Sequence, residues 1–387
     1  MHKPIYLDHG ATTPVDPDVV AAMLPYWTEA YGNPASVHQF GRTASGGLEQ
    51  ARETIARLLK AQPAEIIFTG CGSESDNLAL RGVMLAARAN GRGNHLITST
   101  IEHKAVLDTA VQLRDYYGFD LTILPVDEYG QIDLADLEAA VQPGTVLISI
   151  MAANNEIGSL QPILSAGQIA HAHGVLFHTD AIQAAATTHW NMATMPIDLL
   201  SLAPHKFYGP KGVGILYLRR GTPFITALTG GSQEEGRRAG TVNVPLAVGA
   251  AAAFQLAQNN RDRDLAHYEQ LRDRLISGIL AAVPDCILTG HPKERLAHHA
   301  SFALRGVNGN DLLMHLDMAG IAASSGSACL TGSPKPAAVL EAIGLDAHWT
   351  MGGLRFTVGR HNSLTEIEEV VKLMPDLVVR VRQFGLQ

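Results

Sequence analysis

Lys206 is the side chain whose place in the sequence best suits it to act as a nucleophile. The chain has only eight lysines, and Lys206 directly follows an apolar run, in the motif Pro204-His-Lys-Phe-Tyr-Gly-Pro-Lys-Gly212. A lysine held in apolar surroundings has a lowered pKa and can form a Schiff base with a carbonyl compound. The alternative is a solvated lysine in a hairpin, which this motif by itself would favour.

Asp180 ends a second apolar run, in the motif His178-Thr-Asp-Ala-Ile-Gln183. A carboxylate in such a place needs a cationic partner, and the protonated nitrogen of a pyridine ring would provide one. The alternative is that Asp180 caps an ordinary helix.

A glycine-rich turn, Phe68-Thr-Gly-Cys-Gly-Ser-Glu-Ser-Asp76, follows a predicted strand and opens a predicted helix. We expect Ser73 to cap that helix, with Asp76 three residues later completing an approximate capping box. Free N–H groups at a helix start, beside glycines that let a ligand approach, would form an anion site. A turn without a ligand is an equally good interpretation of this motif.

The three cysteines of the chain are too few for a disulfide framework or a cysteine-rich metal site, and they fit a reducing compartment. Cys329 lies in the glycine- and serine-rich residues 324–336, where a core thiol would be out of place. We therefore expect a mobile loop that carries a reactive cysteine. Cys71 in its glycine turn is expected to have a packing role, and Cys286 to lie in the core of a strand.

The elements that must position these residues alternate between strands and helices from about residue 45 to residue 220. Several strand candidates are apolar at consecutive positions, as strands covered on both faces must be, so the pattern predicts a mostly parallel, doubly wound α/β sheet. The seven candidates are residues 65–68, 95–98, 121–124, 146–150, 175–177, 198–202 and 214–218.

The chain changes character after about residue 250. A charged amphipathic helix over residues 258–282 precedes two short strand candidates, and a last helix is expected from about residue 364 to 383, introduced by Ser363. The two strand candidates are residues 300–304 and 354–358. We therefore predict a large domain of residues 16–250 and a small α+β domain made of residues 1–15 and 251–387.

Charge and hydropathy exclude several classes of protein. The 29 Lys+Arg and 37 Asp+Glu give a formal net charge of −8, which excludes a generic basic nucleic-acid binder. The most apolar stretch, residues 246–257, is too short to cross a bilayer, which takes about 20 residues; we expect no membrane association and a cytoplasmic location. The 17 histidines include two close pairs but no complete ligand spacing, so no metal is expected.

In their order along the chain, these motifs resemble those of the cysteine desulfurases of the NifS/IscS group, within the class V aminotransferase family of pyridoxal-phosphate (PLP) enzymes. The resemblance covers essentially the whole chain and implies the type I fold of PLP-dependent transferases, with a mostly parallel seven-stranded sheet in the large domain and a smaller α+β domain. The further motifs that carry it are Tyr6-Leu-Asp-His-Gly-Ala-Thr-Thr-Pro14, Tyr31-Gly-Asn-Pro34, Glu102-His-Lys-Ala105, Ala153-Asn-Asn-Glu156, Gly236-Arg-Arg-Ala-Gly-Thr241, Ser324-Ser-Gly-Ser-Ala-Cys329 and Leu354-Arg-Phe356.

The resemblance implies a set of cofactor-binding residues. Lys206 would hold PLP through a Schiff base and move the Cα proton of the substrate. Asp180 would pair with the pyridinium nitrogen, Gln183 would reach the ring hydroxyl, and His103 would stack on the ring. The phosphate would be bound by Gly72, Ser73, His205 and, from the neighbouring subunit of a homodimer, Thr241.

The resemblance also implies a substrate site and a reaction. Asn33, Asn155 and Arg355 would bind L-cysteine, with Asn155 also contacting the cofactor and Arg355 gripping the carboxylate. Cys329 would attack the substrate sulfur, keep it as a persulfide and release L-alanine. The sulfur would then pass to an acceptor protein, in a pathway such as iron–sulfur cluster assembly.

Four positions depart from the family pattern, all near the expected phosphate site. Ala203 stands in place of the usual phosphate-binding serine, and one lost hydrogen bond would weaken phosphate binding by roughly 1–2 kcal/mol unless another group replaces it. Cys71, Ser73 and Val242 stand where the family usually has glycine, threonine and glutamate. None of these changes removes Lys206 or Cys329.

Two other functions are compatible with parts of the sequence. An aminotransferase on the same scaffold would need Lys206 and Asp180 but not Cys329. A non-catalytic sulfur-transfer scaffold would keep the fold alone, and the presence of Lys206, Asp180, His103 and Arg355 together argues against it.

Overall fold

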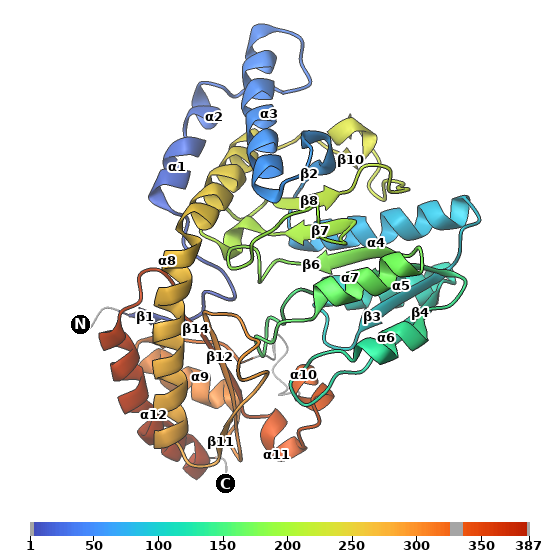
Figure 1. The fold of residues 1–387 in the computed structure, drawn as a ribbon. Coiled ribbons are helices and arrows are strands. Elements are labelled where there is room, and N and C mark those ends of the chain that lie inside the picture. Colours follow the sequence, from blue (N-terminus) through green and yellow to red (C-terminus); the bar gives the residue numbers. More distant parts are fainter. Residues whose placement is uncertain (1–3, 326–335, 385–387) are drawn as a thin grey trace.

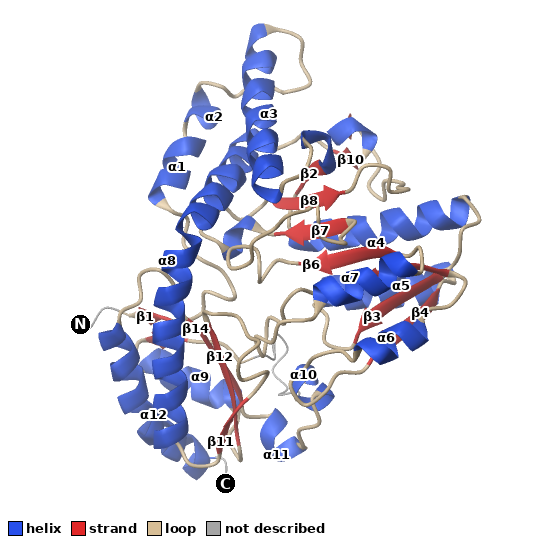
Figure 2. Ribbon diagram, in the orientation of Figure 1, coloured by secondary structure: helices blue, strands red, loops and turns tan. Residues whose placement is uncertain are grey.

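A seven-stranded sheet forms the centre of the larger body of the protein (Figures 1 and 2). The computed structural model describes residues 4–325 and 336–384. The strand order is β2-β8-β7-β6-β5-β3-β4, and β8 runs antiparallel to both of its neighbours whereas the other pairs are parallel. These strands are β2 (Ile66–Thr69), β3 (His95–Ser99), β4 (Asp120–Leu124), β5 (Thr145–Ser149), β6 (Leu176–Asp180), β7 (Leu199–Leu202) and β8 (Gly214–Leu218). All seven predicted strands are thus confirmed.

Successive apolar residues of each strand lie on opposite faces of this sheet, so both faces are apolar. On β2, Ile66 and Phe68 pack into one core and Ile67 packs into the other, because successive strand side chains point to opposite faces. Helices cover both faces, as the doubly wound pattern predicts. These helices are α3 (Gln39–Leu59), α4 (Gly72–Ala89), α5 (Lys104–Tyr117), α6 (Leu134–Ala140) and α7 (Ile163–Ala172).

A second, smaller body contains its own core around a three-stranded antiparallel sheet. The strand order is β11-β12-β14, and a two-residue strand β1 pairs in parallel with β13 beside it. The strands are β1 (Ile5–Tyr6), β11 (Cys286–Leu288), β12 (His299–Leu304), β13 (Ile321–Ala322) and β14 (Gly353–Thr357). The helices are α9 (Gly309–Met318), α10 (Ala338–Ala342), α11 (Ala347–Thr350) and α12 (Leu364–Phe384).

One 39-residue helix, α8 (Val244–Ala282), joins the two bodies (Figure 1). Its first part packs into the core of the large sheet, together with α3, whereas residues from Tyr268 onward pack into the second core, together with α12. The predicted division at residue 250 falls inside this unbroken helix and stays a prediction.

The remaining elements lie at the edges of the larger body. Helices α1 (Pro17–Met23) and α2 (Pro25–Thr28) precede α3, and a hairpin of β9 (Ser232–Gln233) and β10 (Arg238–Ala239) precedes α8. The buried pair of Arg52 and Glu234, 2.8 Å apart, ties this hairpin region to α3.

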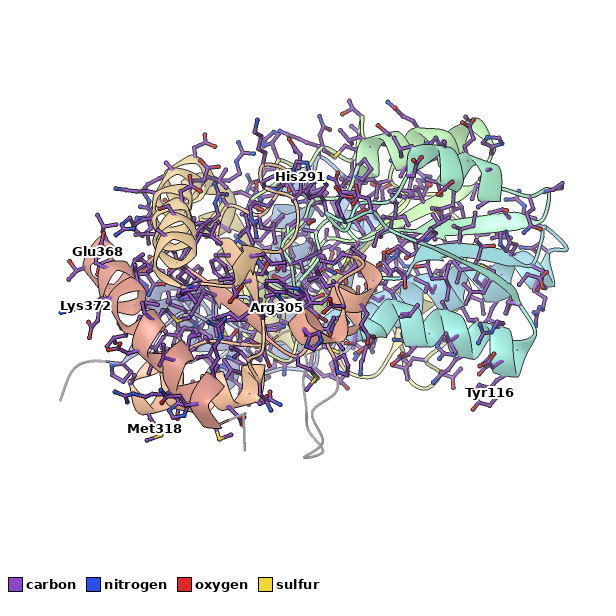
Figure 3. All side chains as sticks on the ribbon, turned by 90° about the horizontal axis from the view of Figure 1, so that it is seen from below. Tyr116, His291, Arg305, Met318, Glu368 and Lys372 are labelled. Atoms are coloured by element: carbon purple, nitrogen blue, oxygen red, sulfur yellow. The ribbon has the colours of Figure 1, made fainter. Side chains whose placement is uncertain are left out.

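Helix α12 is amphipathic. Ile367, Val370 and Met374 face the second core, whereas Glu368 and Lys372 project from its outer side (Figure 3). Within residues 4–325 and 336–384, none of the helices is both long and apolar enough to cross a membrane.

Candidate active site

A cavity of about 250 Å³ lies where the large sheet meets the second body, at the carboxyl ends of several parallel strands. Ligands of open α/β sheets bind at this kind of edge. The cavity brings together nine of the predicted site residues: Gly72, Ser73, His103, Asn155, Asp180, Gln183, His205, Lys206 and Arg355. Asn33 and Thr241 are exposed and do not line it, and Cys329 lies outside the described residues.

Lys206 follows β7 in a short 3-10 turn and points to the segment after β1. Its Nζ donates to the carbonyl oxygens of Gly10 at 2.6 Å and Ala11 at 2.8 Å. Burial lowers the pKa of this amine to about 8, and the positive charge of Arg355 adds to the effect, whereas the carboxylates of Asp180 and Asp8 oppose it. Lys206 is therefore the partly desolvated lysine that the sequence predicted and not a solvated hairpin lysine.

Asp180 is the last residue of β6 and is almost completely buried. Its Oδ1 accepts a hydrogen bond from the Ile182 N–H at 2.9 Å, but turns follow instead of a helix, so the capping interpretation is wrong. Burial raises the pKa of this carboxyl, whereas His103 and Lys206 favour its charged form. A cation in the cavity would relieve the unfavourable burial of this charge.

The start of α4 differs from its predicted geometry. The helix begins at Gly72, and the Sγ of Cys71, not the hydroxyl of Ser73, accepts the capping hydrogen bond, from the Glu74 N–H at 3.4 Å. The Glu74 carboxylate in turn accepts from the Gly70 N–H at 2.7 Å. The prediction of Ser73 as the cap is therefore wrong, because the helix starts one residue before Ser73. Ser73 is instead exposed at the cavity beside the free N–H groups of the first turn.

Cys71 is likewise not the packing residue that the sequence suggested. Its side chain is exposed and lines the cavity. Gly214 on β8 is the residue that packs closely against the backbone of the Cys71 turn. A Cβ placed on Gly214 would lie 2.4 Å from the Cys71 carbonyl oxygen and 2.4 Å from the Thr69 Oγ1.

We expect Gly214→Ala to lower the free energy of unfolding by about 1–3 kcal/mol, because the rigid backbone of the Cys71 turn must shift to admit the methyl group. Thermal and denaturant unfolding measure this change. Gly46→Ala on α3 is the matched control, since nothing lies within 4 Å of the added Cβ. Equal stability of the Gly214→Ala protein and the wild type would contradict the close fit.

Two histidines at the cavity have defined hydrogen bonds. The Nδ1 of His103 accepts from the Ala105 N–H at 3.1 Å and caps α5, so the proton of the neutral ring lies on Nε2. The Nδ1 of His205 lies 3.2 Å from the Thr12 hydroxyl, and burial lowers the pKa of His205 to about 4, which leaves the ring neutral at pH 7.

Arg355 and Gln183 connect the cavity to the N-terminal segment. The Nη1 of Arg355 donates to the Asn155 carbonyl oxygen at 2.7 Å, and its Nη2 donates to the Asp8 Oδ1 at 2.9 Å. The Gln183 amide donates to the Gly10 carbonyl oxygen at 3.0 Å. The sequence motif that contains Asp8 and Gly10 is one of those that carry the resemblance, but the resemblance assigned neither residue a role.

Glu102 is a buried residue beside the site, to which the sequence assigned no role. Its Oε1 accepts from the Ser99 hydroxyl at 2.8 Å and from the Met151 N–H at 2.9 Å. Burial raises the pKa of Glu102 to about 8, so the group is protonated at neutral pH. Glu102 thereby ties the end of β3 to the segment after β5.

Among the described residues, no group of three or more histidine, cysteine or acidic side chains is arranged to hold a metal ion. The side chains that line the cavity include the amine of Lys206, the carboxylate of Asp180, the guanidinium of Arg355, two imidazoles and the thiol of Cys71.

The comparisons with known proteins agree with this arrangement. The family model described as Aminotransferase class-V matches residues 5–370. "Cysteine desulfurase 2" of Trichormus variabilis is 46% identical over 378 residues, which cover 98% of this chain and 94% of that protein. A solved structure of a NifS-like protein has a TM-score of 0.90 at 35% identity, covering 97% of this chain and 99% of that one. A structure described as SspA in complex with cysteine has a TM-score of 0.80 at 34% identity, covering 93% of this chain and 100% of that one.

The chain therefore belongs to the class V aminotransferase family, and within that family to the cysteine desulfurases.

Proposed function

We propose that this protein is a PLP-dependent desulfurase that converts L-cysteine into L-alanine and passes the sulfur through a persulfide on Cys329 to an acceptor protein, for iron–sulfur cluster assembly. The observation that carries the proposal is the meeting of Lys206, Asp180 and Arg355 in one cavity. These residues come from three separate regions of the chain and supply the amine, the acid and the cation that the reaction requires.

The donor set of the cavity fits PLP. The amine of Lys206 would hold the aldehyde carbon, Asp180 would face the pyridine nitrogen, and the ring of His103 would lie against the pyridine. The N–H groups at the start of α4, with Ser73 and His205, would hold the phosphate, which suits the positive end of a helix dipole. Ala203 lines the same part of the cavity without a hydroxyl, so the phosphate would have one side-chain donor fewer there.

When bound, PLP withdraws electrons from the Cα of an attached amino acid. The buried carboxylate of Asp180 favours a protonated pyridine nitrogen, which strengthens that withdrawal. Lys206, whose pKa is lowered to about 8, exchanges between its neutral and charged forms near neutral pH and is suited to move the Cα proton. The guanidinium of Arg355 would hold the substrate carboxylate through paired hydrogen bonds.

The sulfur transfer uses the thiol that we assign to Cys329 as its nucleophile. Its thiolate attacks the sulfur of L-cysteine, the Cβ–S bond breaks, and an S–S bond forms on the enzyme. Cβ takes up a proton, so that L-cysteine and one enzyme thiol give L-alanine and one enzyme persulfide. A second thiol, on the acceptor protein, then takes the outer sulfur.

Quantifying both products from L-cysteine tests the proposed function. The purified holoenzyme should release alanine and, with a reducing thiol as acceptor, sulfide in equal amounts. Formation of a 2-oxo acid with consumption of an amino-group acceptor would indicate an aminotransferase instead. The absence of any turnover would favour the non-catalytic scaffold.

We also propose a homodimer in which Thr241 and Asn33 act on the partner's cavity. Both residues are exposed and lie outside the cavity of their own chain. Large apolar side chains are also exposed in the ten residues before Asn33, with Leu24, Trp27 and Tyr31 each more than half exposed, and apolar surface of this kind is typical of an interface. Sedimentation at assay concentration should give a dimer, and a fully active monomer would contradict the proposal.

A further inference from the structure

Arg355 uses only part of its hydrogen-bonding capacity within the protein. The residue lies on β14 and is 7% exposed. Its Nη1 and Nη2 donate to the Asn155 carbonyl oxygen and the Asp8 carboxylate, whereas its buried Nε has no partner among the described residues. A buried donor without a partner is unfavourable, and Arg355 lines the adjoining cavity, where a bound carboxylate would supply acceptors for its N–H groups.

Asp8 is itself firmly held beside β14. Its carbonyl oxygen accepts from the Tyr6 hydroxyl at 3.1 Å and from the Ala11 N–H at 3.0 Å. Asp8 also forms a β-bridge with Thr357, two residues after Arg355 on the same strand. The side chain of Asp8 therefore meets the guanidinium from a backbone that is fixed against the strand carrying it.

The geometry of a guanidinium gives this ion pair a consequence for binding. A carboxylate binds arginine best through two parallel N–H groups. With one N–H of Nη1 held by Asn155 and one N–H of Nη2 held by Asp8, three of the five N–H groups remain for a ligand: the Nε–H and the second N–H of each Nη. The long arginine side chain would otherwise have to lose its rotamer freedom during binding.

We propose that Asp8 is a positioning residue, which holds the Arg355 guanidinium so that its remaining N–H groups donate to the carboxylate of the amino-acid substrate. This inference rests on the proposed function, because it assigns Arg355 to the substrate carboxylate. Asp8 itself does not touch the substrate in this arrangement. The positioning effect applies to ligands that carry a carboxylate.

Two product-like ligands separate this role from a general structural one. L-alanine has an amine and a carboxylate, whereas L-alaninamide keeps the amine and the methyl group but replaces the carboxylate by a neutral amide. The absorbance change of the cofactor reports the binding of each ligand to the holoenzyme. In Asp8→Asn, which keeps the size of the side chain, we expect the Kd of L-alanine to rise about tenfold and that of L-alaninamide to change less than about twofold.

Steady-state kinetics should show the same selectivity. Asp8→Asn is expected to raise the KM for L-cysteine about tenfold while kcat stays within about threefold of the wild type. Asp115→Asn is the matched control: Asp115 pairs with Arg114 at 2.7 Å on the exposed surface of α5, and its replacement should change none of these values. Asp8→Glu keeps the charge but displaces it by one methylene group, so its L-alanine Kd should rise about threefold, also without an effect on L-alaninamide.

The results distinguish this inference from the proposed function. Equal losses for both ligands, or unchanged or tighter binding of L-alanine, would overturn the positioning role while wild-type turnover of L-cysteine still supported the desulfurase. A wild-type protein that binds L-alanine but makes no alanine from L-cysteine would instead refute the desulfurase activity. If Asp8→Asn does not fold, Asp8→Glu gives the same comparison of ligands and decides the matter in the same way.

Discussion

Replacing Lys206 by alanine is expected to remove the covalently held cofactor and to lower turnover of L-cysteine by at least about 10³-fold, since we propose that the same amine holds PLP and moves a proton. Borohydride reduction followed by peptide mass spectrometry locates the attached cofactor in the wild type. Lys211→Ala is the control, because Lys211 belongs to the same motif but is exposed and does not line the cavity. Trapped cofactor on Lys211, or an active Lys206→Ala protein, would refute the assignment.

The lowered pKa of Lys206 adds a dependence on pH to this prediction. A neutral amine is the form that attacks the cofactor aldehyde, and burial brings the pKa of Lys206 from 10.5 to about 8. The rate at which the cofactor-free protein takes up PLP should therefore rise as pH approaches 8 and level off above it. A rate that continued to rise up to pH 10 would mean that Lys206 has an ordinary lysine pKa.

The sequence predicted the large sheet well because its strands are apolar on both faces. A run such as Leu199–Leu202 must be covered on each side wherever it lies, so burial alone identifies it. Helix α8 was harder to delimit, because its alanine-rich first part and its charged second part pack against different cores and so have different patterns. The sequence therefore showed the second part as a separate helix.

Helix starts show what a local pattern can and cannot decide. Ser363 precedes α12 as predicted, and its hydroxyl and the Glu366 carboxylate exchange hydrogen bonds with each other's backbone N–H, at 3.3 and 2.8 Å. At α4 the same reasoning chose the wrong cap. The sequence predicted Ser73, but the helix begins at Gly72 and Cys71 caps it. The close approach of Gly214 to the carbonyl of Cys71, from a strand more than 140 residues away, belongs to a tertiary context that no local pattern contains.

The residues of the site also differ in whether the sequence could predict them. Asp180 and Lys206 were predictable because each follows an apolar strand at the edge where ligands bind. The parts played by Asp8, Gly10 and Ala11 were not, since they depend on backbone carbonyls and on an ion pair that joins residues almost 350 positions apart. Backbone acceptors carry no side-chain signal, so only the folded chain reveals them.

Cys329→Ser should retain PLP and still bind L-cysteine but lose persulfide formation and sulfide release, because serine offers no thiolate to accept the sulfur. We expect at least about a 10²-fold loss of sulfide release, the scale at which a nucleophile or a general base contributes. Mass spectrometry after a single turnover of the wild type should locate one extra sulfur atom on Cys329. The cofactor spectrum with L-cysteine confirms that the variant still binds its substrate.

The other two cysteines are the matched controls, and they differ in how accessible their thiols are. Burial raises the pKa of the Cys286 thiol to about 12, so almost no thiolate forms, and Cys286→Ser should keep substantial activity. Cys71 is the serious rival, because its thiol is exposed at the cavity and lies at the N-terminus of α4. Cys71→Ser retains a side chain that can cap α4 and should also keep substantial activity. A persulfide on Cys71, together with an active Cys329→Ser protein, would make the helix-terminal thiol the nucleophile and refute the assignment to Cys329.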